Sequence, residues 1–374
     1  MIYKSLVKKV SIPVEKKTKQ KEYLESGRLP IVDQGKELIG GYTDDVNNAL
    51  DCNLPVIVFG DHTKAVKYIN FPFGAGADGI KVLEPKEEIL PKYLYYGTHY
   101  LTFKIVDKGY ARHYQHIEKK DLPVPSLEDQ HRIVTRIEEL FSQLDSGVET
   151  LKKTKEQLKV YRQAVLKEAF DNIDEYVNFE TVIVGTPQNG IYKPKSDYGF
   201  GVPILRIDGF YDGFIQDDYD YKLVNITDEE LARYRLEIGN IVINRVNSMP
   251  YLGKCALVRK LNRPTVFESN MMRITLNTKL VNGEYISYYL SSLAGKKELT
   301  KNAKQAVNQA SINQKDVGNA LIPLPSLKEQ VNAVNKIESR LSVCDSIEKT
   351  IDTALQEAEA LRQSILKQAF EGGL

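Results

Sequence analysis

The sequence has few cysteines, almost no net charge and no long hydrophobic run. Its 374 residues include only three cysteines, Cys52, Cys255 and Cys344, too widely separated for a disulfide framework or a metal site. Lys plus Arg (51) balance Asp plus Glu (50), so only local basic patches could bind a polyanion. No stretch approaches the ~18 apolar residues that cross a bilayer, and no signal-like run opens the chain. We therefore expect a cytoplasmic protein without membrane contact.

The chain does contain a long internal repeat. The segment DLPVPSLEDQ at 121–130 recurs as LIPLPSLKEQ at 321–330, and YRQAVLKEAF at 161–170 recurs as LRQSILKQAF at 361–370. The offset stays at 200 residues throughout, and 18 of the 50 paired positions are identical. An insertion would rotate the apolar side of a helix by about 100° per residue. The gapless repeat therefore predicts one continuous helix in each copy.

Local signals predict where these helices begin and what covers them. Ser126 with Asp129, and Ser326 with Glu329, follow the pattern of a helix N-cap and its partner, so the helices should begin near residues 127 and 327. Roughly 43 residues make a helix of about 65 Å, which is unstable alone unless its apolar stripe packs against another element. The helix of the other copy is the natural packing partner. Three- and four-residue steps predict a coiled-coil seam through Ile133, Ile137, Leu140, Leu144, Val148, Leu151, Leu158, Tyr161, Val165, Val334, Ile337, Leu341, Cys344, Ile347, Ile351, Leu355, Ala358, Leu361 and Ile365.

The two remaining segments differ from each other. Short apolar runs such as LPVIVFG (54–60) and GNIVINR (239–245), bounded by turn residues, predict mixed, strand-rich α/β domains. We thus predict an α+β chain with four segments: a first domain (1–120), a helix (121–170), a second domain (171–320) and a helix (321–374). Antiparallel pairing of the helices would make a single-chain pseudo-dimer with an approximate two-fold axis. Duplex DNA with two half-sites at a fixed distance matches such a molecule.

These motifs carry a family resemblance. Each copy of the repeat opens with a PSL motif that ends in Gln and closes with RQ-x-x-LK-x-AF, and the two domains are dissimilar. In these features the chain closely resembles type I restriction-modification specificity subunits, over essentially its whole length. In the second domain VPILRIDGF, YRLEIGNIVINRVNS and QAVNQASINQKDV look like family landmarks, whereas the first domain resembles a different subtype.

The resemblance implies a function and partners. Each domain would be a target-recognition domain that reads one half of a bipartite, asymmetric DNA sequence, and the helices would act as a spacer that docks two adenine methyltransferase subunits. Restriction subunits would join that complex. The chain would then be non-catalytic by itself and hold no cofactor, with S-adenosylmethionine, ATP and Mg²⁺ expected only on the partner subunits.

The candidate DNA-contacting residues of the second domain are mainly arginines, asparagines, glutamines and lysines in loops or at the ends of strands. Arg can bind guanine through two hydrogen bonds, and Asn or Gln can bind adenine in the same way. Each candidate has a structural alternative: an ion pair for Arg245, a pair with a neighbour such as Asp208 for Arg206, a solvated hairpin around residue 190, or a soluble loop at 301–315. The candidates are Gln188, Asn189, Lys193, Arg206, Arg245, Asn247, Ser248, Lys304, Asn308 and Gln309.

In the first domain, aromatic and basic residues interleave in GYARHY (109–114), a mixture that suits a nucleic-acid surface but also ordinary half-buried packing. Thr63 and Lys64 form a loop after an apolar strand, where a nuclease-like pairing of Asp61 with His62 lacks further carboxylates. The candidates for DNA contact are Gln34, Tyr42, Thr63, Lys64, Tyr110, Arg112, His113 and Tyr114.

Two short motifs resemble those of enzymes but lack the features that the enzymes require. GAGADG (74–79) fits a phosphate-loop pattern, but the IKVLEP that follows predicts a strand instead of a helix, so we expect only a loop. Asn70-Phe71-Pro72-Phe73 resembles the catalytic tetrapeptide of adenine methyltransferases but lacks one proline and an upstream methyl-donor motif. Two alternatives stay open: a stand-alone methyltransferase-nuclease, which would show activity alone, and a coiled-coil scaffold, which would bind no specific DNA.

Overall fold

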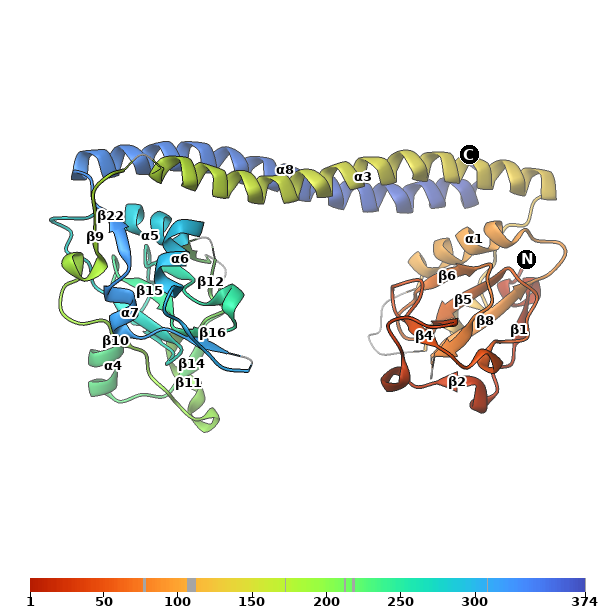
Figure 1. Cartoon of the computed structure of the whole chain (residues 1–374). Coiled ribbons are helices and arrows are strands. Elements are labelled where there is room, and N and C mark those ends of the chain that lie inside the picture. Colours follow the sequence, from red (N-terminus) through yellow and green to blue (C-terminus); the bar gives the residue numbers. More distant parts are fainter. Residues whose placement is uncertain are drawn as a thin grey trace. The chain divides into compact units, whose positions relative to one another are not determined.

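The computed structural model describes residues 1–76, 79–105, 112–171, 173–211, 213–216, 219–307 and 309–373. The chain forms two compact units: unit 1 comprises Met1–Lys153 and Ile351–Leu374, and unit 2 comprises Thr154–Thr350. Each unit contains one strand-rich domain and part of each of two long helices, α3 and α8 (Figure 1). Both long helices therefore run through both units.

In unit 1, a four-stranded antiparallel sheet of order β1-β8-β5-β6 carries apolar residues on both faces. Successive side chains of a strand point to opposite faces. Ile57 and Phe59 accordingly pack with helix α1, and Val56 and Val58 pack with a second sheet of order β2-β7-β3-β4. The apolar run VIVFG is explained by this two-sided burial. The elements are β1 (Val7–Val10), β2 (Lys17–Thr18), β3 (Leu29–Val32), β4 (Gly41–Thr43), β5 (Val56–Gly60), β6 (Val66–Ile69), β7 (Gly74–Gly76), β8 (Ile80–Pro85), α1 (Pro91–Phe103) and α2 (Tyr114–Ile117).

In unit 2, a six-stranded mixed sheet has the order β10-β19-β15-β17-β13-β12. Ile241 and Ile243 of its central strand pack with helix α5, and Val242 packs on the opposite face. The elements are β9 (Tyr176–Asn178), β10 (Gln188–Asn189), β11 (Tyr198–Leu205), β12 (Phe210–Tyr211), β13 (Gly213–Ile215), β14 (Lys222–Val224), α4 (Asp228–Tyr234), β15 (Ile241–Asn244), β16 (Val246–Asn247), β17 (Cys255–Leu257), β18 (Val266–Phe267), β19 (Met271–Ile274), α5 (Gly283–Ser291), α6 (Leu293–Thr300), β20 (Lys304–Gln305), β21 (Ala310–Ser311), α7 (Gln314–Gly318) and β22 (Leu321–Pro323).

The two long helices begin where the capping residues predict. Helix α3 (Leu127–Phe170) has 44 residues and α8 (Leu327–Glu371) has 45. The Ser126 hydroxyl accepts the Asp129 N–H at 3.2 Å, and the Ser326 hydroxyl accepts the Glu329 N–H at 3.4 Å. The predicted N-caps are thus confirmed in both copies.

Within each unit, the parts of α3 and α8 pair in antiparallel fashion. In unit 2, Arg162 contacts Asp345 at 2.6 Å and Glu168 contacts Arg340 at 2.6 Å, so rising numbers on α3 meet falling numbers on α8. In unit 1, Asp145 pairs with Arg362. The ion pairs Arg162 with Asp345 and Arg362 with Asp145 are the same contact with the two repeats exchanged. The mixed α/β domains and paired long helices confirm the predicted fold class.

The predicted seam was wrong at three positions. Tyr161, Ile347 and Leu361 are exposed by 43%, 40% and 51%. The next residue of each helix takes the less exposed place instead: Arg162 and Glu348 form an ion pair at 3.0 Å in unit 2, and Arg362 pairs with Asp145 in unit 1. The sequence steps alone could not distinguish these positions, because adjacent residues lie only about 100° apart around a helix.

One loop prediction also differs from the structure. Gly74–Gly76, within GAGADG, is strand β7 and pairs in parallel with both β2 and β3. Glycine suits this strand because a Cβ on Gly76 would lie 2.6 Å from both Asp33 and the Tyr23 hydroxyl. Among the residues described, each helix is either too short or too polar to span a membrane.

Candidate functional site

Two predicted segments of the second domain meet in a small sheet. Strand β21 pairs with β16 on one side and with β20 on the other, so Ala310 lies opposite both Asn247 and Gln305. Lys304 and Gln309 are exposed on the hairpin, and Asn247 and Ser248 are half-buried. Asn308 lies outside the described residues. The tertiary fold therefore brings together polar residues that are about 60 positions apart in the sequence.

Arg245 links this small sheet to the large one. Its N–H donates to the carbonyl of Asn270 at 2.9 Å, and its own carbonyl accepts from Ile312 at 2.9 Å. The guanidinium Nη1 donates to the Ser269 carbonyl at 3.1 Å, and Nε is buried without a partner among the described residues. Arg245 makes no ion pair with any residue of the described ranges. The structure thus offers no support for the ion-pair alternative at this position.

Two amides lie on the strands at either side of β19: Asn244, which directly precedes Arg245, is fully buried, and Asn189 is half-buried. Asn189 on β10 pairs opposite Met272, and Asn244 on β15 pairs opposite Met271. The Asn189 Oδ1 and both polar side-chain atoms of Asn244 are buried and lack partners among the described residues. Each such atom costs about 1–3 kcal/mol. Asn244 was missed by the sequence analysis; its signal is a polar residue that closes an otherwise apolar strand, IVIN.

Two further candidates of the second domain form ion pairs. Lys193 contacts Glu230 at 2.8 Å. On strand β10, the side-chain Nε2 of Gln188 donates to the carbonyl of Asn189 at 2.8 Å. Arg206 contacts Glu268 at 3.2 Å, not the neighbouring Asp208. Burial alone would lower the pKa of Arg206, but the Glu268 carboxylate outweighs it and raises that pKa. The structure favours the ion-pair alternative for Arg206, and it places Lys193 in an ion pair, which differs from the solvated hairpin that was the alternative there.

In the first domain, the turn between β5 and β6 brings three candidates together. The Thr63 hydroxyl donates to the Gln34 carbonyl at 2.5 Å, and Lys64 adopts a positive φ of 60°. Thr63 is exposed, and Gln34 and Lys64 are half-buried. Tyr42 lies on β4, opposite Pro30, and is half-buried. An exposed turn with these groups can present them to a ligand.

The GYARHY segment is mostly buried where it is described. His113 and Tyr114 are exposed by 1% and 6%, and their N–H groups donate to Asp61 at 2.8 and 2.9 Å. Burial raises the pKa of Tyr114 to about 12. Arg112 is exposed, and Tyr110 lies outside the described residues. The structure favours the packing alternative for His113 and Tyr114.

Asp61 itself pairs with Lys81 at 3.4 Å. In the described part of the chain, no group of three or more His, Cys, Asp or Glu residues could hold a metal ion.

A basic cavity of the first domain was missed by the sequence analysis. Lys9 and Lys81 lie on the paired strands β1 and β8, and Lys17 lies on β2. Together with Gly76 and Gly79 these lysines line a cavity of about 200 Å³. Lysines beside glycine backbone suit a phosphate oxygen, and in this set the ammonium group of Lys81 is paired with Asp61 at 3.4 Å. The signal in the sequence was the lysine-rich first strand, VKKV.

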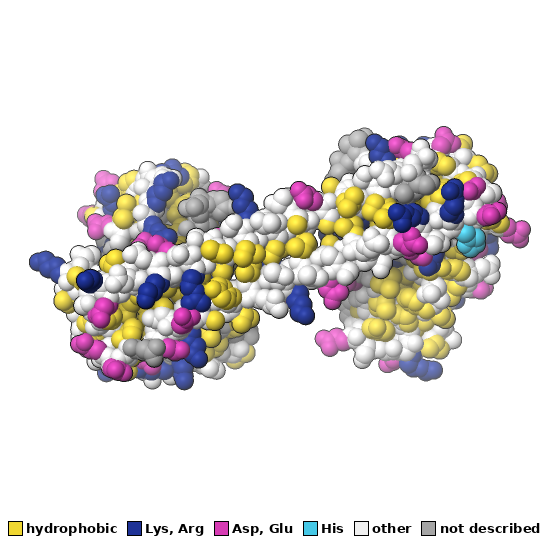
Figure 2. Space-filling model, turned by 90° about the horizontal axis from the view of Figure 1, so that it is seen from above, with side chains coloured by type: hydrophobic (Ala, Val, Ile, Leu, Met, Phe, Trp, Pro, Cys, Tyr) yellow, Lys and Arg dark blue, Asp and Glu magenta, His cyan; other side chains and the backbone are white. Residues whose placement is uncertain are grey.

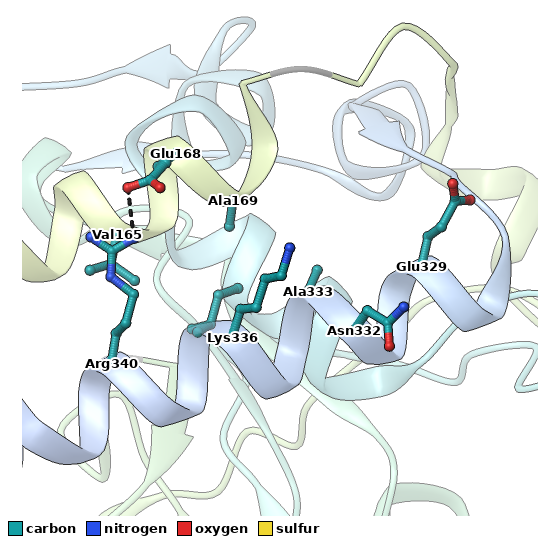
Figure 3. Close-up of a pocket in the computed structure, with 9 residues that line it drawn as sticks. Val165, Glu168, Ala169, Glu329, Asn332, Ala333, Lys336 and Arg340 are labelled. Carbon is teal, nitrogen blue, oxygen red and sulfur yellow. Dashed lines mark hydrogen bonds and ion pairs between the residues drawn. The ribbon is translucent and has the colours of Figure 1, made fainter.

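The helix pair itself carries an apolar surface and a cavity. Four exposed apolar residues of its unit 2 part, here called the helix-pair patch, are Val160, Tyr161, Val343 and Ile347, exposed by 71%, 43%, 57% and 40%. Figure 2 shows hydrophobic side chains gathered along the two long helices. A cavity of about 340 Å³ in the same unit has Val165 and Ile337 among its lining residues. Figure 3 shows Glu168 of α3 directed at Arg340 of α8.

Comparisons with known proteins agree with the fold and the repeat. The sequence matches the family described as type I restriction modification DNA specificity domain over residues 10–160 and 186–357. It is 30% identical over 270 residues to the type I restriction enzyme EcoKI specificity subunit of Escherichia coli (strain K12), covering 68% of this chain and 58% of that relative. The EcoR124I/EcoR124II specificity subunit of Escherichia coli is 24% identical over 380 residues, covering 96% of this chain and 89% of the relative.

Solved structures show the same fold. A chain from a study of complex assembly and conformational transition of the type I R-M system superposes with a TM-score of 0.71 at 18% identity, covering 100% of this chain and 97% of that one. The HsdS subunit from Thermoanaerobacter tengcongensis superposes with a TM-score of 0.50 at 19% identity, covering 100% and 96%. Because the family match takes in most of both repeats and both domains, the chain belongs to the type I restriction-modification DNA specificity family.

Proposed function

We propose that this chain is the DNA sequence-specificity subunit of a type I restriction-modification system and recognises a bipartite, asymmetric DNA site. The supporting observation is that two dissimilar domains are carried on equivalent parts of one helix pair. The contact of Arg162 with Asp345 in unit 2 recurs as that of Arg362 with Asp145 in unit 1. Two different domains that are held on equivalent parts of the helix pair suit a DNA site whose two halves differ in sequence.

In the second domain, the reading residues are those around Arg245. Its guanidinium donates from Nη1 to one carbonyl and forms no ion pair among the described residues. Because Nε is buried, a guanine would have to be bound through the terminal nitrogens of the guanidinium. Asn247 lies on the adjoining small sheet, and Lys304 is exposed on the next hairpin. We assign base reading to Arg245 and Asn247 and phosphate contact to Lys304.

In the first domain, we assign phosphate contact to Lys9 and Lys17 at the basic cavity and base contact to the turn at Thr63 and Lys64. Phosphate contacts hold the register on the duplex without carrying sequence information. This division of roles predicts that changes at the cavity weaken binding to all sequences alike.

Catalysis and cofactors belong to partner subunits in this proposal. The helix-pair patch, whose four residues are exposed by 40% to 71%, would dock an adenine methyltransferase subunit, and the matching part of unit 1 would dock a second. Restriction subunits would join this complex, and S-adenosylmethionine, ATP and Mg²⁺ would be bound there and not by this chain. Paired helices of 44 and 45 residues would act as the spacer between half-sites.

The decisive experiment is methylome sequencing of a host that carries the wild-type chain or Arg245→Ala. The wild-type chain should produce methylation at one bipartite sequence. Arg245→Ala should relax the preference at one base pair of one half-site, a discrimination worth about 1–3 kcal/mol. Lys304→Ala is the matched control, which should reduce methylation at every site and leave the recognised sequence unchanged. Methylation that does not depend on this chain would refute the proposed function, and uniform weakening by Arg245→Ala would reassign that residue to a phosphate.

A further inference from the structure

A buried glutamine joins the domain of unit 1 to the start of its long helix. Gln130, fully buried, lies in the first turn of α3. Its Oε1 accepts the backbone N–H of Leu90 at 2.8 Å, while Nε2 donates to the carbonyls of Glu88 at 3.1 Å and Pro125 at 3.0 Å. The amide thus uses its acceptor and both donors on backbone groups.

Gln330 makes the same three hydrogen bonds in unit 2. It is also fully buried, and its Oε1 accepts the N–H of Asn282 at 2.8 Å. Its Nε2 donates to the carbonyls of Leu280 at 3.1 Å and Pro325 at 2.8 Å. Leu90 and Asn282 are the N-cap residues of α1 and α5, the helices that each domain packs beside the long helix. Two domains with different strand topology therefore share one attachment.

Other polar contacts between domain and helix are open to solvent. Lys92 contacts Glu138 at 2.7 Å and Arg259 contacts Glu338 at 2.9 Å, but these four side chains are exposed by 39% to 49%, so water screens both ion pairs. The hydroxyls of Tyr96 and Tyr288 reach Glu138 and Glu338 at 3.5 and 3.4 Å, and both carboxylates are partly exposed. Ring packing, such as Tyr93 on Phe370 in unit 1, tolerates sliding because apolar contact has no preferred direction. A buried amide with three hydrogen bonds does not tolerate sliding, because hydrogen bonds weaken steeply when their distance or angle changes. The orientation of each domain on its helix is thus most tightly defined at the glutamine.

We propose that Gln130 and Gln330 are positioning residues that set the angle at which each reading domain is held, and thereby the accepted gap between half-sites. This inference rests on the proposed function. Neither side chain can touch DNA, because both are fully buried. Each glutamine acts through the backbone of the N-cap that it holds.

The test uses the full chain in complex with its methyltransferase subunits and a set of duplexes. The duplexes carry both half-sites, taken from the wild-type methylome, with gaps from two base pairs shorter to two longer. Gln330→Met keeps the length of the side chain and removes all three hydrogen bonds. The ratio of methylation at the preferred gap to that at neighbouring gaps should fall by about tenfold or more, given the strength of buried hydrogen bonds. The bases required in each half-site should not change.

Two further variants separate positioning from stability. Val242→Ala removes packing on the face of the unit 2 sheet opposite α5 and should lower stability while keeping the single gap. Gln130→Met makes the same test in unit 1 and serves if Gln330→Met does not fold. An unchanged gap ratio in a folded glutamine variant, or equal broadening in Val242→Ala, would overturn the inference. A wild-type complex with no bipartite site would instead overturn the proposed function.

Discussion

Phe170 is the residue whose removal should most clearly separate the stabilities of the two units. It closes helix α3, is exposed by 4%, and packs edge-on against Tyr285 and Tyr289 of α5 at ring distances of 5.3 Å each. Phe370 occupies the same place in unit 1, exposed by 3%, against Tyr93 at 4.9 Å and Tyr100 at 5.2 Å. Each phenylalanine joins one long helix to one domain.

The expected loss follows from this burial. A buried Phe→Ala change costs about 3–5 kcal/mol, and ring pairs of this geometry contribute about 0.5–1.5 kcal/mol beyond the area they bury. We therefore expect Phe170→Ala to lower the free energy of unfolding of unit 2 by about 4 kcal/mol. A domain typically has a free energy of unfolding of about 5–15 kcal/mol, so the variant should stay folded at 25 °C with only a small remaining free energy of unfolding.

Amide hydrogen exchange measured on peptides can assign the loss to a unit, and urea denaturation gives its size. Phe170→Ala should lose protection within Thr154–Thr350, and the matched Phe370→Ala should lose it within Met1–Lys153 and the end of α8. A loss below about 1 kcal/mol, or equal loss of protection in both units after either change, would refute the reasoning.

Two other changes test charge and docking. Burial alone would raise the pKa of Glu84, but the Asn53 N–H at 2.9 Å and Lys8 at 3.0 Å outweigh it and lower that pKa. The stabilisation by the Glu84 carboxylate is therefore present above the unfolded pKa and is lost as pH falls through the lower folded pKa. Glu84→Gln should lower the free energy of unfolding, measured with urea, by about 1–3 kcal/mol at pH 7 and by progressively less as the pH falls below the unfolded pKa. Val343→Glu with Ile347→Glu should weaken binding of one methyltransferase subunit, measured by analytical ultracentrifugation, while circular dichroism stays unchanged; undiminished binding would remove the helix-pair patch from the docking surface.

Part of the candidate site could be predicted and part could not. Arg245 was predicted as a DNA contact because an arginine follows an apolar strand, a pattern contained in neighbouring residues. Asn244 was missed because its burial depends on β19 and β10, which lie far along the chain. For His113 and Tyr114 the sequence left both a nucleic-acid surface and half-buried packing open. Asp61, more than fifty positions earlier, accepts hydrogen bonds from their backbone N–H groups in the core. Contacts across such distances leave no periodic trace.

The sequence by itself determined the repeat, the start of both long helices and the family, and the ion pairs of the structure decided that the helices pair in antiparallel fashion. The features that the sequence determined rest on caps and on three- and four-residue steps, which neighbouring residues encode. Only the tertiary structure decided that Arg162 and Glu348, not Tyr161 and Ile347, face each other between the helices, and that Gln130 and Gln330 hold the N-caps of α1 and α5. Their partners lie 40 or more positions away, so which groups meet is set by how the domains pack on the helices and not by local pattern.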